Sequence, residues 1–288
     1  MQFLLKSITR APLPLLYAVG WLVYAIVFHV ARWRRPQVAS DLARAFPEKS
    51  KAERAAIERQ SYRNLADVVM ETIWGFGASA ETMKRRVRFD NPRIVDAAVE
   101  AKQSVVLLAP HFCNWEWLLS AGGAAFELPI DAVYQTLRVK PIDDFVLRAR
   151  TRFGGKPIRR EDFVFEMISR AGTPRGYALI ADQTPPRGDR KHWTRFLNRD
   201  TAFFVGAEKV ARFLDAPVLY VAMRRTARGH YAVRLVPLAE PPYDIGGDAG
   251  HSPIMEGFAR HLEQAVRASP ADWLWVQKRW KYPRTEGG

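Results

Sequence analysis

A histidine and a glutamate lie five positions apart at the end of a branched apolar run. The run Val105–Leu108 has the pattern of a buried strand and ends at Pro110, directly before His111. Glu116 follows within an apolar segment that predicts a helix. With His111 in the turn between strand and helix, the first helical turn would bring the Glu116 carboxylate beneath the imidazole. Such a pair has a fixed tautomer and a raised basicity, which suits it to take a proton from a hydroxyl group.

Alternatives exist for each polar residue of this segment. A histidine after a strand is often a capping or packing residue, but the carboxyl end of a sheet strand is also where open α/β sheets bind ligands. Cys113 could act as a nucleophile, although a cysteine flanked by aromatic residues more often packs in a core. Asn114 either caps the helix that carries Glu116 or donates a hydrogen bond to substrate, and we favour the cap.

Helical and strand patterns alternate along the rest of the chain. This alternation predicts an α/β fold with a mixed, largely parallel central sheet covered by helices. We expect strands at residues 105–108, 128–134, 156–159, 177–181 and 218–223, with 231–236 as an antiparallel partner. We expect one helix to begin at Pro47, the helix after His111 to end at Gly122-Gly123, and another helix over residues 202–214. Residues 185–191 and 240–253 read as loops.

The composition is compatible with a reducing compartment and favours anionic partners. The chain has 288 residues and is 48% hydrophobic, enough for one large domain with a small extension. Its single cysteine excludes an intrachain disulfide. The 44 Lys and Arg against 30 Asp and Glu give a formal net charge of +14. Such a field attracts nucleic acid, an anionic membrane or an acidic carrier protein.

The N-terminus favours the membrane among these partners. Residues 13–31 carry no charge, and a helix over residues 14–31 would be about 27 Å long, close to the thickness of a hydrocarbon core. A signal peptide is not indicated, since the segment ends in Arg32-Trp33-Arg34-Arg35 without a small-residue cleavage site. The helix could span the bilayer, lie in its interface or form a hairpin leg; a buried core helix is the alternative. We therefore divide the chain into an anchor, residues 1–35, and a catalytic domain, residues 36–288.

Motifs along most of the chain resemble one enzyme family. His111-Phe-Cys-Asn-Trp-Glu116 resembles the H-x4-[DE] signature of lysophospholipid-type (glycerolipid acyltransferase-like) acyltransferases, and above all the lauroyl and myristoyl transferases of late lipid A biosynthesis. Further similar segments are Leu42–Ser50 with Glu53, Arg54 and Tyr62; Arg150–Gly154 with Pro157–Arg159; Ala181–Gln183; and Pro270–Trp275 with Arg279–Lys281. Departures are Cys113 for the usual glycine, Asp41 for asparagine, and Gln277-Lys278 for His-Arg.

The resemblance implies a membrane-bound O-acyltransferase at the cytoplasmic face of the bacterial inner membrane. It implies transfer of a fatty acyl group from acyl carrier protein, or from acyl-CoA, to a hydroxyl of a lipid A precursor in lipopolysaccharide biosynthesis. His111 would be the general base and Glu116 its partner, with no metal or organic cofactor. The residues expected at the substrate are Arg150, Arg138, Asn114, Asp182 and Gln183. The basic segments 148–160, 187–195 and 278–284 would suit an acidic carrier protein and an anionic glycolipid, with part of them ordinary solvated surface.

Two other interpretations remain open. The same chemistry could act on another glycolipid, a phosphoinositol mannoside or an aminolipid. Alternatively, the chain could be a non-catalytic membrane protein that binds anionic lipid. Nucleic acid is not an expected partner, because no recognised nucleic-acid-binding motif is present.

Overall fold

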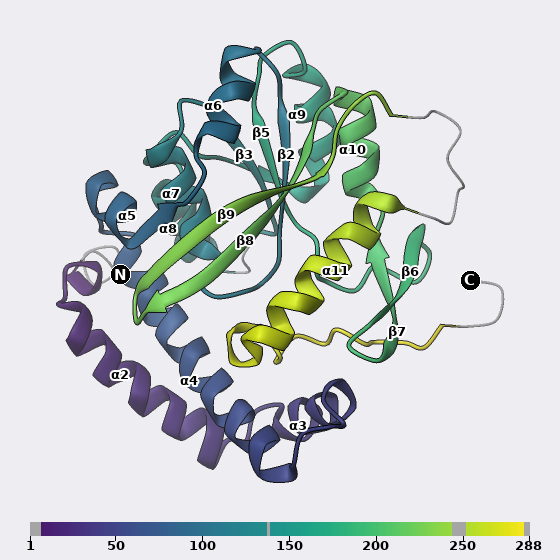
Figure 1. The fold of residues 1–288 in the computed structure, drawn as a ribbon. Helices are drawn as coiled ribbons and strands as arrows, with labels where there is room; N and C mark the ends of the chain where they lie inside the picture. The colour runs from purple at the N-terminus through teal and green to yellow at the C-terminus, as the bar shows by residue number, and fades with distance from the viewer. Residues whose placement is uncertain (1–6, 137–138, 244–251, 285–288) are drawn as a thin grey trace.

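A mixed β-sheet forms the centre of the molecule (Figure 1). The computed structural model describes residues 7–136, 139–243 and 252–284. Among these residues, seven strands form the sheet in the order β1-β9-β8-β2-β5-β3-β4. Their bounds are β1 Val87–Phe89, β2 Val105–Ala109, β3 Ile130–Tyr134, β4 Lys156–Arg159, β5 Gly176–Ile180, β8 Val218–Ala227 and β9 His230–Ala239. The five strands from β8 to β4 run parallel, and β9 pairs antiparallel with β8. The predicted fold class is confirmed.

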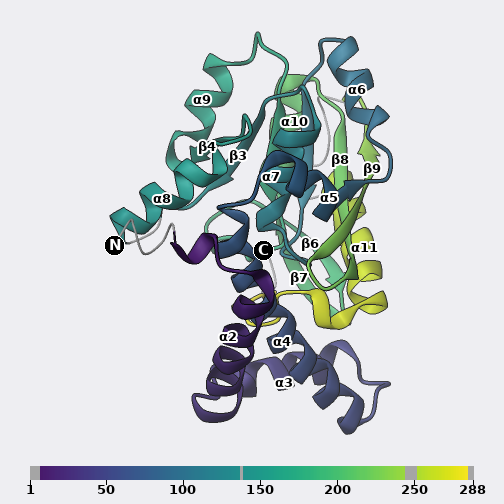
Figure 2. The same ribbon diagram turned by 90° about the vertical axis from the view of Figure 1, so that its left-hand side faces the viewer.

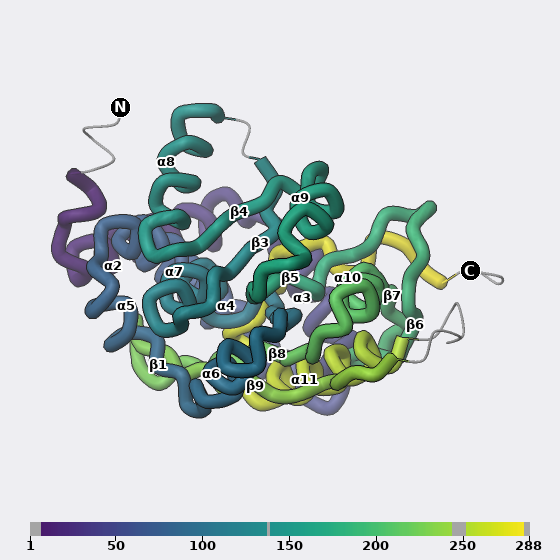
Figure 3. Tube along the Cα trace, turned by 90° about the horizontal axis from the view of Figure 1, so that it is seen from above, coloured from purple at the N-terminus to yellow at the C-terminus, as the bar shows by residue number. Residues whose placement is uncertain are grey.

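Helices cover both faces of this sheet. Figure 3, seen from above, places α7 and α10 on opposite sides of the strands. The bounds in the covering layers are α5 Ala80–Arg86, α6 Arg93–Glu100, α7 Glu116–Ala125, α8 Lys140–Arg150, α9 Phe163–Ser169, α10 Gly206–Leu214 and α11 Pro253–Ala268. Short 3₁₀ turns occupy Arg160–Asp162 and Pro270–Asp272. Strand β2 is buried along its whole length, as a strand covered on both faces must be.

A group of N-terminal helices extends from one end of the sheet (Figures 1 and 2). They are α2 Leu13–Ala25, which continues as a π-helical turn over Ile26–Val30, α3 Arg35–Ala45 and α4 Lys51–Gly75. Helix α2 packs against α4 so closely at Gly20 that an added Cβ would lie 2.9 Å from Met70 Cγ. The stretch Leu13–Val30 is long and apolar enough to cross a membrane by length and composition, and most of it is exposed.

Several boundaries differ from the sequence-based expectations. Helix α4 begins at Lys51, because Ser50 and Glu53 form a reciprocal capping box there, so the predicted start at Pro47 is wrong. Gly122 and Gly123 do not end α7, which continues to Ala125. An added Cβ on Gly123 would meet Phe153 O at 2.3 Å, so this glycine permits close packing rather than a helix end.

The segment before α10 also differs. Residues 191–204 form an antiparallel hairpin of β6 Lys191–Phe196 and β7 Arg199–Phe204. The expected start of a helix at residue 202 is therefore wrong, and the sequence pattern assigned residues 192–201 to no element. Its two-residue turn, Leu197-Asn198, has φ values of 48° and 63°. Positive φ at both central residues is the geometry of a tight hairpin turn, and asparagine tolerates it well. The helix begins only at Gly206.

Candidate active site

The register of two neighbouring strands brings a histidine and an aspartate together. Strands β2 and β5 are parallel, and Ala109 lies opposite Ile180 at their carboxyl ends. The backbone pairing extends one step further, since Ala181 N donates to Ala109 O at 3.0 Å. Two residues beyond the aligned positions, the chains reach His111 and Asp182. The pair is therefore positioned by the sheet itself.

The carboxylate of Asp182 holds the imidazole of His111. His111 Nδ1 lies 2.7 Å from Asp182 Oδ1, and the His111 backbone N–H donates to Asp182 Oδ2 at 3.1 Å. Because a carboxylate oxygen only accepts, the proton of the neutral ring belongs on Nδ1, which leaves the Nε2 lone pair free to act as a base. The expected carboxylate partner, Glu116, is thus replaced by Asp182 in this role.

Asp182 is itself fixed by its surroundings. Its side chain is fully buried and also accepts hydrogen bonds from Trp273 Nε1 at 2.9 Å and Gln277 Nε2 at 3.2 Å. Burial raises the pKa of Asp182, but the charge of His111 and the hydrogen bonds outweigh burial and the net pKa is lowered. A buried carboxylate with this many donors stays ionised and keeps one orientation. Asp182 was expected at the substrate, and its burial places it behind the histidine instead.

Burial and two nearby carboxylates shift the pKa of His111 in opposite directions. Burial lowers the pKa of His111, whereas the charge of Asp182, its hydrogen bond and the charge of Glu116 raise it, so that the net pKa lies above the ordinary value of 6.5. The imidazole is only slightly exposed, at 12% of its side chain. It packs edge-on against Trp115, with ring centroids 5.1 Å apart.

Glu116 forms an ion pair with Arg150 in the same site. Arg150 Nη2 donates to Glu116 Oε2 at 2.6 Å, and both side chains remain partly exposed, at 20% and 25%. Glu116 is the first residue of α7 and Arg150 the last of α8, so two helix ends meet here. The charge-assisted contact fixes the guanidinium beside the imidazole's cavity.

A large apolar cavity adjoins these side chains. It has a volume of about 900 Å³ and is lined by His111, Glu116 and Arg150 together with mainly aliphatic and aromatic residues. The apolar lining comes from strands β2, β3 and β5 and from helices α7, α9 and α10 and includes Leu107, Leu119, Ile130, Met167, Leu179 and Val210. Val164, Ile168 and Phe213 also line it while being 61%, 55% and 53% exposed, so the cavity reaches the surface between α9 and α10. Its size and lining suit a long hydrocarbon chain.

The remaining expected site residues divide into three groups. Gln183 is exposed and lines the cavity. Asn114 is fully buried: its Oδ1 accepts from Trp117 N at 3.2 Å in the first turn of α7, and its Nδ2 donates to Glu71 at 2.8 Å. Asn114 thus bonds the first turn of α7 from the position before its N-cap, Trp115, and does not line the cavity. Arg138 lies outside the described residues.

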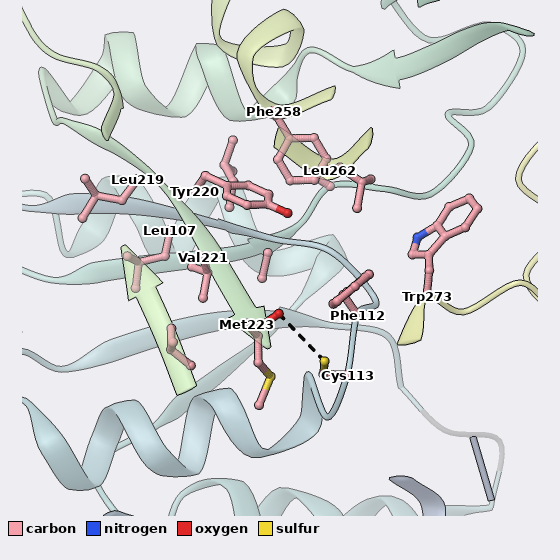
Figure 4. Close-up of a cluster of buried hydrophobic side chains, with 14 of the residues drawn as sticks. Leu107, Phe112, Cys113, Leu219, Tyr220, Val221, Met223, Phe258, Leu262 and Trp273 are labelled. Carbon is pink, nitrogen blue, oxygen red and sulfur yellow. Dashed lines mark hydrogen bonds between the residues drawn. The ribbon is translucent and has the colours of Figure 1, made fainter. Parts of the chain in front are cut away.

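Cys113 lies in the core (Figure 4). It is 1% exposed, and its thiol faces the carbonyl oxygen of Met223 at 3.8 Å. Burial raises the pKa of the Cys113 thiol well above its ordinary value, which disfavours the thiolate that a nucleophile needs. Its φ of 52° is a backbone conformation that favours glycine.

One of the expected surface cations also belongs to the core. Arg279 is 2% exposed, and burial lowers its pKa to about 10. Its guanidinium donates to Ala202 O at 2.7 Å and stacks over the Phe203 ring. The segment 278–284 is therefore partly structural, and the expectation that its cations face a partner is wrong for Arg279. Among the described residues, no group of three or more His, Cys, Asp or Glu side chains is arranged to hold a metal ion.

Sequence reasoning missed the partnership of His111 with Asp182, and with it the two residues that orient Asp182. The signal was present in the chain, since both residues directly follow predicted strands. What was absent was the order of strands in the sheet, which alone makes β2 and β5 neighbours.

Comparison with known proteins identifies the family of the chain. No curated protein matches the chain. The model of the family described as bacterial lipid A biosynthesis acyltransferase matches residues 2–282, nearly the whole sequence. The buried His–Asp pair beside a long apolar cavity thus lies in a chain that belongs to the bacterial lipid A biosynthesis acyltransferase family.

Proposed function

We propose that this acyltransferase moves a fatty acyl group from an acyl-carrier-protein thioester to a hydroxyl of a lipid A precursor, with His111 as general base. The observation that carries the proposal is His111 locked through Nδ1 to buried Asp182, at the side of an apolar cavity of about 900 Å³. Acyl-CoA is the other donor to test.

The reaction follows from the tautomer of His111. Nε2 accepts the proton of the acceptor hydroxyl while the hydroxyl oxygen attacks the thioester carbonyl carbon. The tetrahedral intermediate then expels the thiolate, which takes the proton from the imidazolium, so that ester and free thiol leave together. Asp182 stabilises the imidazolium between these steps, as a buried carboxylate does in a catalytic triad. As written, the reaction requires no metal or organic cofactor.

Arg150 supplies positive charge on the cavity wall. Charge develops on the carbonyl oxygen during attack, and a preorganised cation next to it lowers the barrier. The ion pair with Glu116 keeps the guanidinium in place, so we assign Glu116 as a positioning residue that also raises the basicity of His111. Arg150 could equally donate hydrogen bonds to a phosphate of the glycolipid, for which its fork geometry is suited.

The apolar cavity is the proposed binding site of the acyl chain. Its mouth carries the exposed apolar residues Val164, Ile168 and Phe213, which favour entry of a lipid chain from a membrane surface. Another glycolipid, a phosphoinositol mannoside or an aminolipid remains the alternative acceptor, because the catalytic pair requires only a hydroxyl.

We further propose attachment to the cytoplasmic face of the inner membrane through α2, lying along the surface. The exposed side of α2 is apolar and includes Leu15, Val19, Trp21 and Leu22, and Ile26 continues it in the π-helical turn. Its other side is docked on α4 and on cations of the folded body: Arg228 stacks on Tyr17, Arg63 on Tyr24 and Arg35 on Phe28. A spanning α2 would carry these charges into hydrocarbon, at about 2.5–3.5 kcal/mol each even on the lowest scales.

His111→Ala tests the catalytic proposal. General-base assistance is worth about 10²–10⁴ in rate, so the variant should lose at least this factor in transfer from labelled acyl carrier protein to lipid A precursor, with unchanged thermal unfolding. His230→Ala, at an exposed position of β9, is the matched control and should retain activity. A His111→Ala enzyme of near-normal turnover would refute His111 as the general base, whereas no transfer by the wild-type protein to any lipid hydroxyl would favour a non-catalytic lipid-binding protein.

A further inference from the structure

Two of the three basic segments, residues 187–195 and 278–284, meet on one side of the molecule. Tyr282 OH donates to Pro185 O at 2.7 Å, which joins the loop after β5 to the C-terminal segment. Figures 1 and 3 show the C-terminal segment beside β6 and β7, on the opposite side of the view from α2. Cations that are far apart in the sequence therefore lie together.

Aromatic rings hold several of these cations in place. Arg187 and Lys191 lie 5.5 Å and 5.4 Å over the ring of Tyr282, and Arg284 lies 5.9 Å over the ring of Trp193. The two rings contact one another edge to face, with centroids 6.1 Å apart. Contacts of this kind order a cation without neutralising its charge. Three like charges thus share one small area of the surface.

Little negative charge balances this area. Within residues 183–195 and 278–284 the one acidic residue is Asp189. No ion pair with a carboxylate of the described residues involves any of the five cations of this area, which we call the basic surface: Arg187, Lys191, Lys278, Lys281 and Arg284. Four of the five are exposed, and Lys191 is partly exposed. An unbalanced field of this sign attracts an acidic partner.

The basic surface is suited to a soluble protein rather than to a membrane. In the part of the chain that the structure describes, no large apolar side chain is exposed within residues 183–195 or 278–284. The third basic segment, residues 148–160, differs, because it lies between α8 and α9, which expose Ile142 and Phe165. Surfaces that enter lipid combine cations with apolar side chains, whereas charge without them is typical of steering between proteins.

The basic surface also adjoins the catalytic cavity. Gln183 lines the cavity and is exposed, and the next residue, Thr184, donates to Lys278 O at 3.0 Å. Gln277, directly before Lys278, donates to Asp182 at 3.2 Å. We propose that the basic surface binds the acidic protein that carries the acyl thioester, so that the thioester arm enters the cavity at Gln183. This inference rests on the proposed carrier-protein donor and goes beyond it by placing the carrier on the enzyme.

Binding of fluorescently labelled holo acyl carrier protein, which bears no acyl group, tests the surface apart from acyl transfer. Arg187→Glu/Lys281→Glu is compared with Arg93→Glu/Arg234→Glu, which makes the same change of net charge on α6 and β9 at exposed cations without ion pairs. All four side chains are exposed, so thermal unfolding should stay unchanged. At low salt the dissociation constant should rise about tenfold or more for the first variant and about twofold or less for the control.

A small donor extends the test to the reaction. With the carrier thioester, KM should rise about tenfold for Arg187→Glu/Lys281→Glu, whereas kcat/KM with an acyl thioester of pantetheine alone should equal the wild-type value, because this donor does not reach the basic surface.

Equal carrier affinities of the two double variants would overturn the proposal. Normal carrier affinity of Arg187→Glu/Lys281→Glu with lost binding to phosphatidylglycerol vesicles would overturn it in favour of a lipid-binding surface. Carrier binding that is lost only in this variant, with no acyl transfer by the wild-type protein, would support the surface and refute the proposed function.

Discussion

The two carboxylates near His111 perform different tasks. Asp182 is fully buried and bonded to Nδ1, so it sets the tautomer and supports the charged ring. Glu116 is partly exposed and bonded to Arg150, so it acts on the imidazole only through space. A single substitution at each position should therefore give distinct kinetic signatures.

The pH dependence of the rate should reveal this difference. Because the net pKa of His111 is raised, kcat/KM should fall as the pH drops through a value above 6.5, where the base becomes protonated. Asp182→Asn removes the larger of the two contributions that raise the pKa of His111, so the fall in rate on the acidic side should move to lower pH. This variant should also lose about 10³–10⁴ in kcat, because the tautomer of His111 is no longer held. Glu116→Gln should move the fall in rate less. Initial rates between pH 5 and 9 measure both, and a larger shift for Glu116→Gln would contradict the assignment.

Cys113 offers a test of backbone strain within the motif. A residue other than glycine at φ 52° is strained by about 1–2 kcal/mol, whereas removing a buried thiol costs a similar amount. The free energy of unfolding of Cys113→Gly should therefore lie within about 1 kcal/mol of the wild-type value, and this variant should keep its activity. The free energy of unfolding of Cys113→Val should be lower than that of wild type by at least about 2 kcal/mol, because a branched side chain rarely adopts this backbone conformation. Denaturant titration compares the two, and inactivity of a folded Cys113→Gly would instead point to a chemical role of the thiol.

Helix α7 joins the catalytic motif to the core through its glycines. Gly123 approaches the carbonyl oxygen of Phe153, three residues beyond the end of α8. This contact holds α7 close to the segment that follows Arg150, and so bears on the distance between Glu116 and Arg150. A bulkier residue at position 123 must push these two segments apart.

Gly123→Ala should destabilise the protein by about 1–3 kcal/mol, because the added methyl would lie 2.3 Å from a backbone oxygen that cannot move freely. Gly172→Ala is the control, since nothing lies within 4 Å of an added Cβ there. The control should be neutral or slightly stabilising. Chemical unfolding measures both; equal effects of the two substitutions would show that α7 can shift without cost.

Local sequence patterns predicted strands better than they predicted which distant residues contact one another. The apolar runs of β2, β8 and β9 identified strands, because burial on a sheet dictates those residue types. The hairpin β6–β7 was missed because charged and polar residues interrupt its apolar pattern, although Asn198 in its turn was a usable signal. The Asp182 partner could not be inferred from spacing, since 71 residues separate it from His111 and only strand order brings them together.

At the scale of the whole molecule, α2 is joined to the catalytic motif through one buried carboxylate. Glu71 of α4 is fully buried and accepts from Tyr17 of α2 at 2.9 Å and from Asn114 of the motif at 2.8 Å. Tyr231 of β9 donates to the same carboxylate at 2.5 Å. An anchor that spans the bilayer apart from the body would break this network. The proposed surface position of α2 keeps it intact and keeps the cavity mouth beside the lipid.

Chemical labelling distinguishes the two topologies, and the chain is well suited to it. Its only cysteine, Cys113, is buried, so a newly introduced cysteine reacts selectively with a membrane-impermeant maleimide. Arg10→Cys lies just before α2 and Arg93→Cys lies on the catalytic domain, and both positions are exposed. If α2 lies along the surface, both variants should be labelled in inverted inner-membrane vesicles and both protected in intact spheroplasts. A spanning helix predicts opposite patterns, with Arg10→Cys labelled in spheroplasts. That result would also require α2 to separate from Arg63 and Arg228, because these charges would otherwise enter the hydrocarbon core.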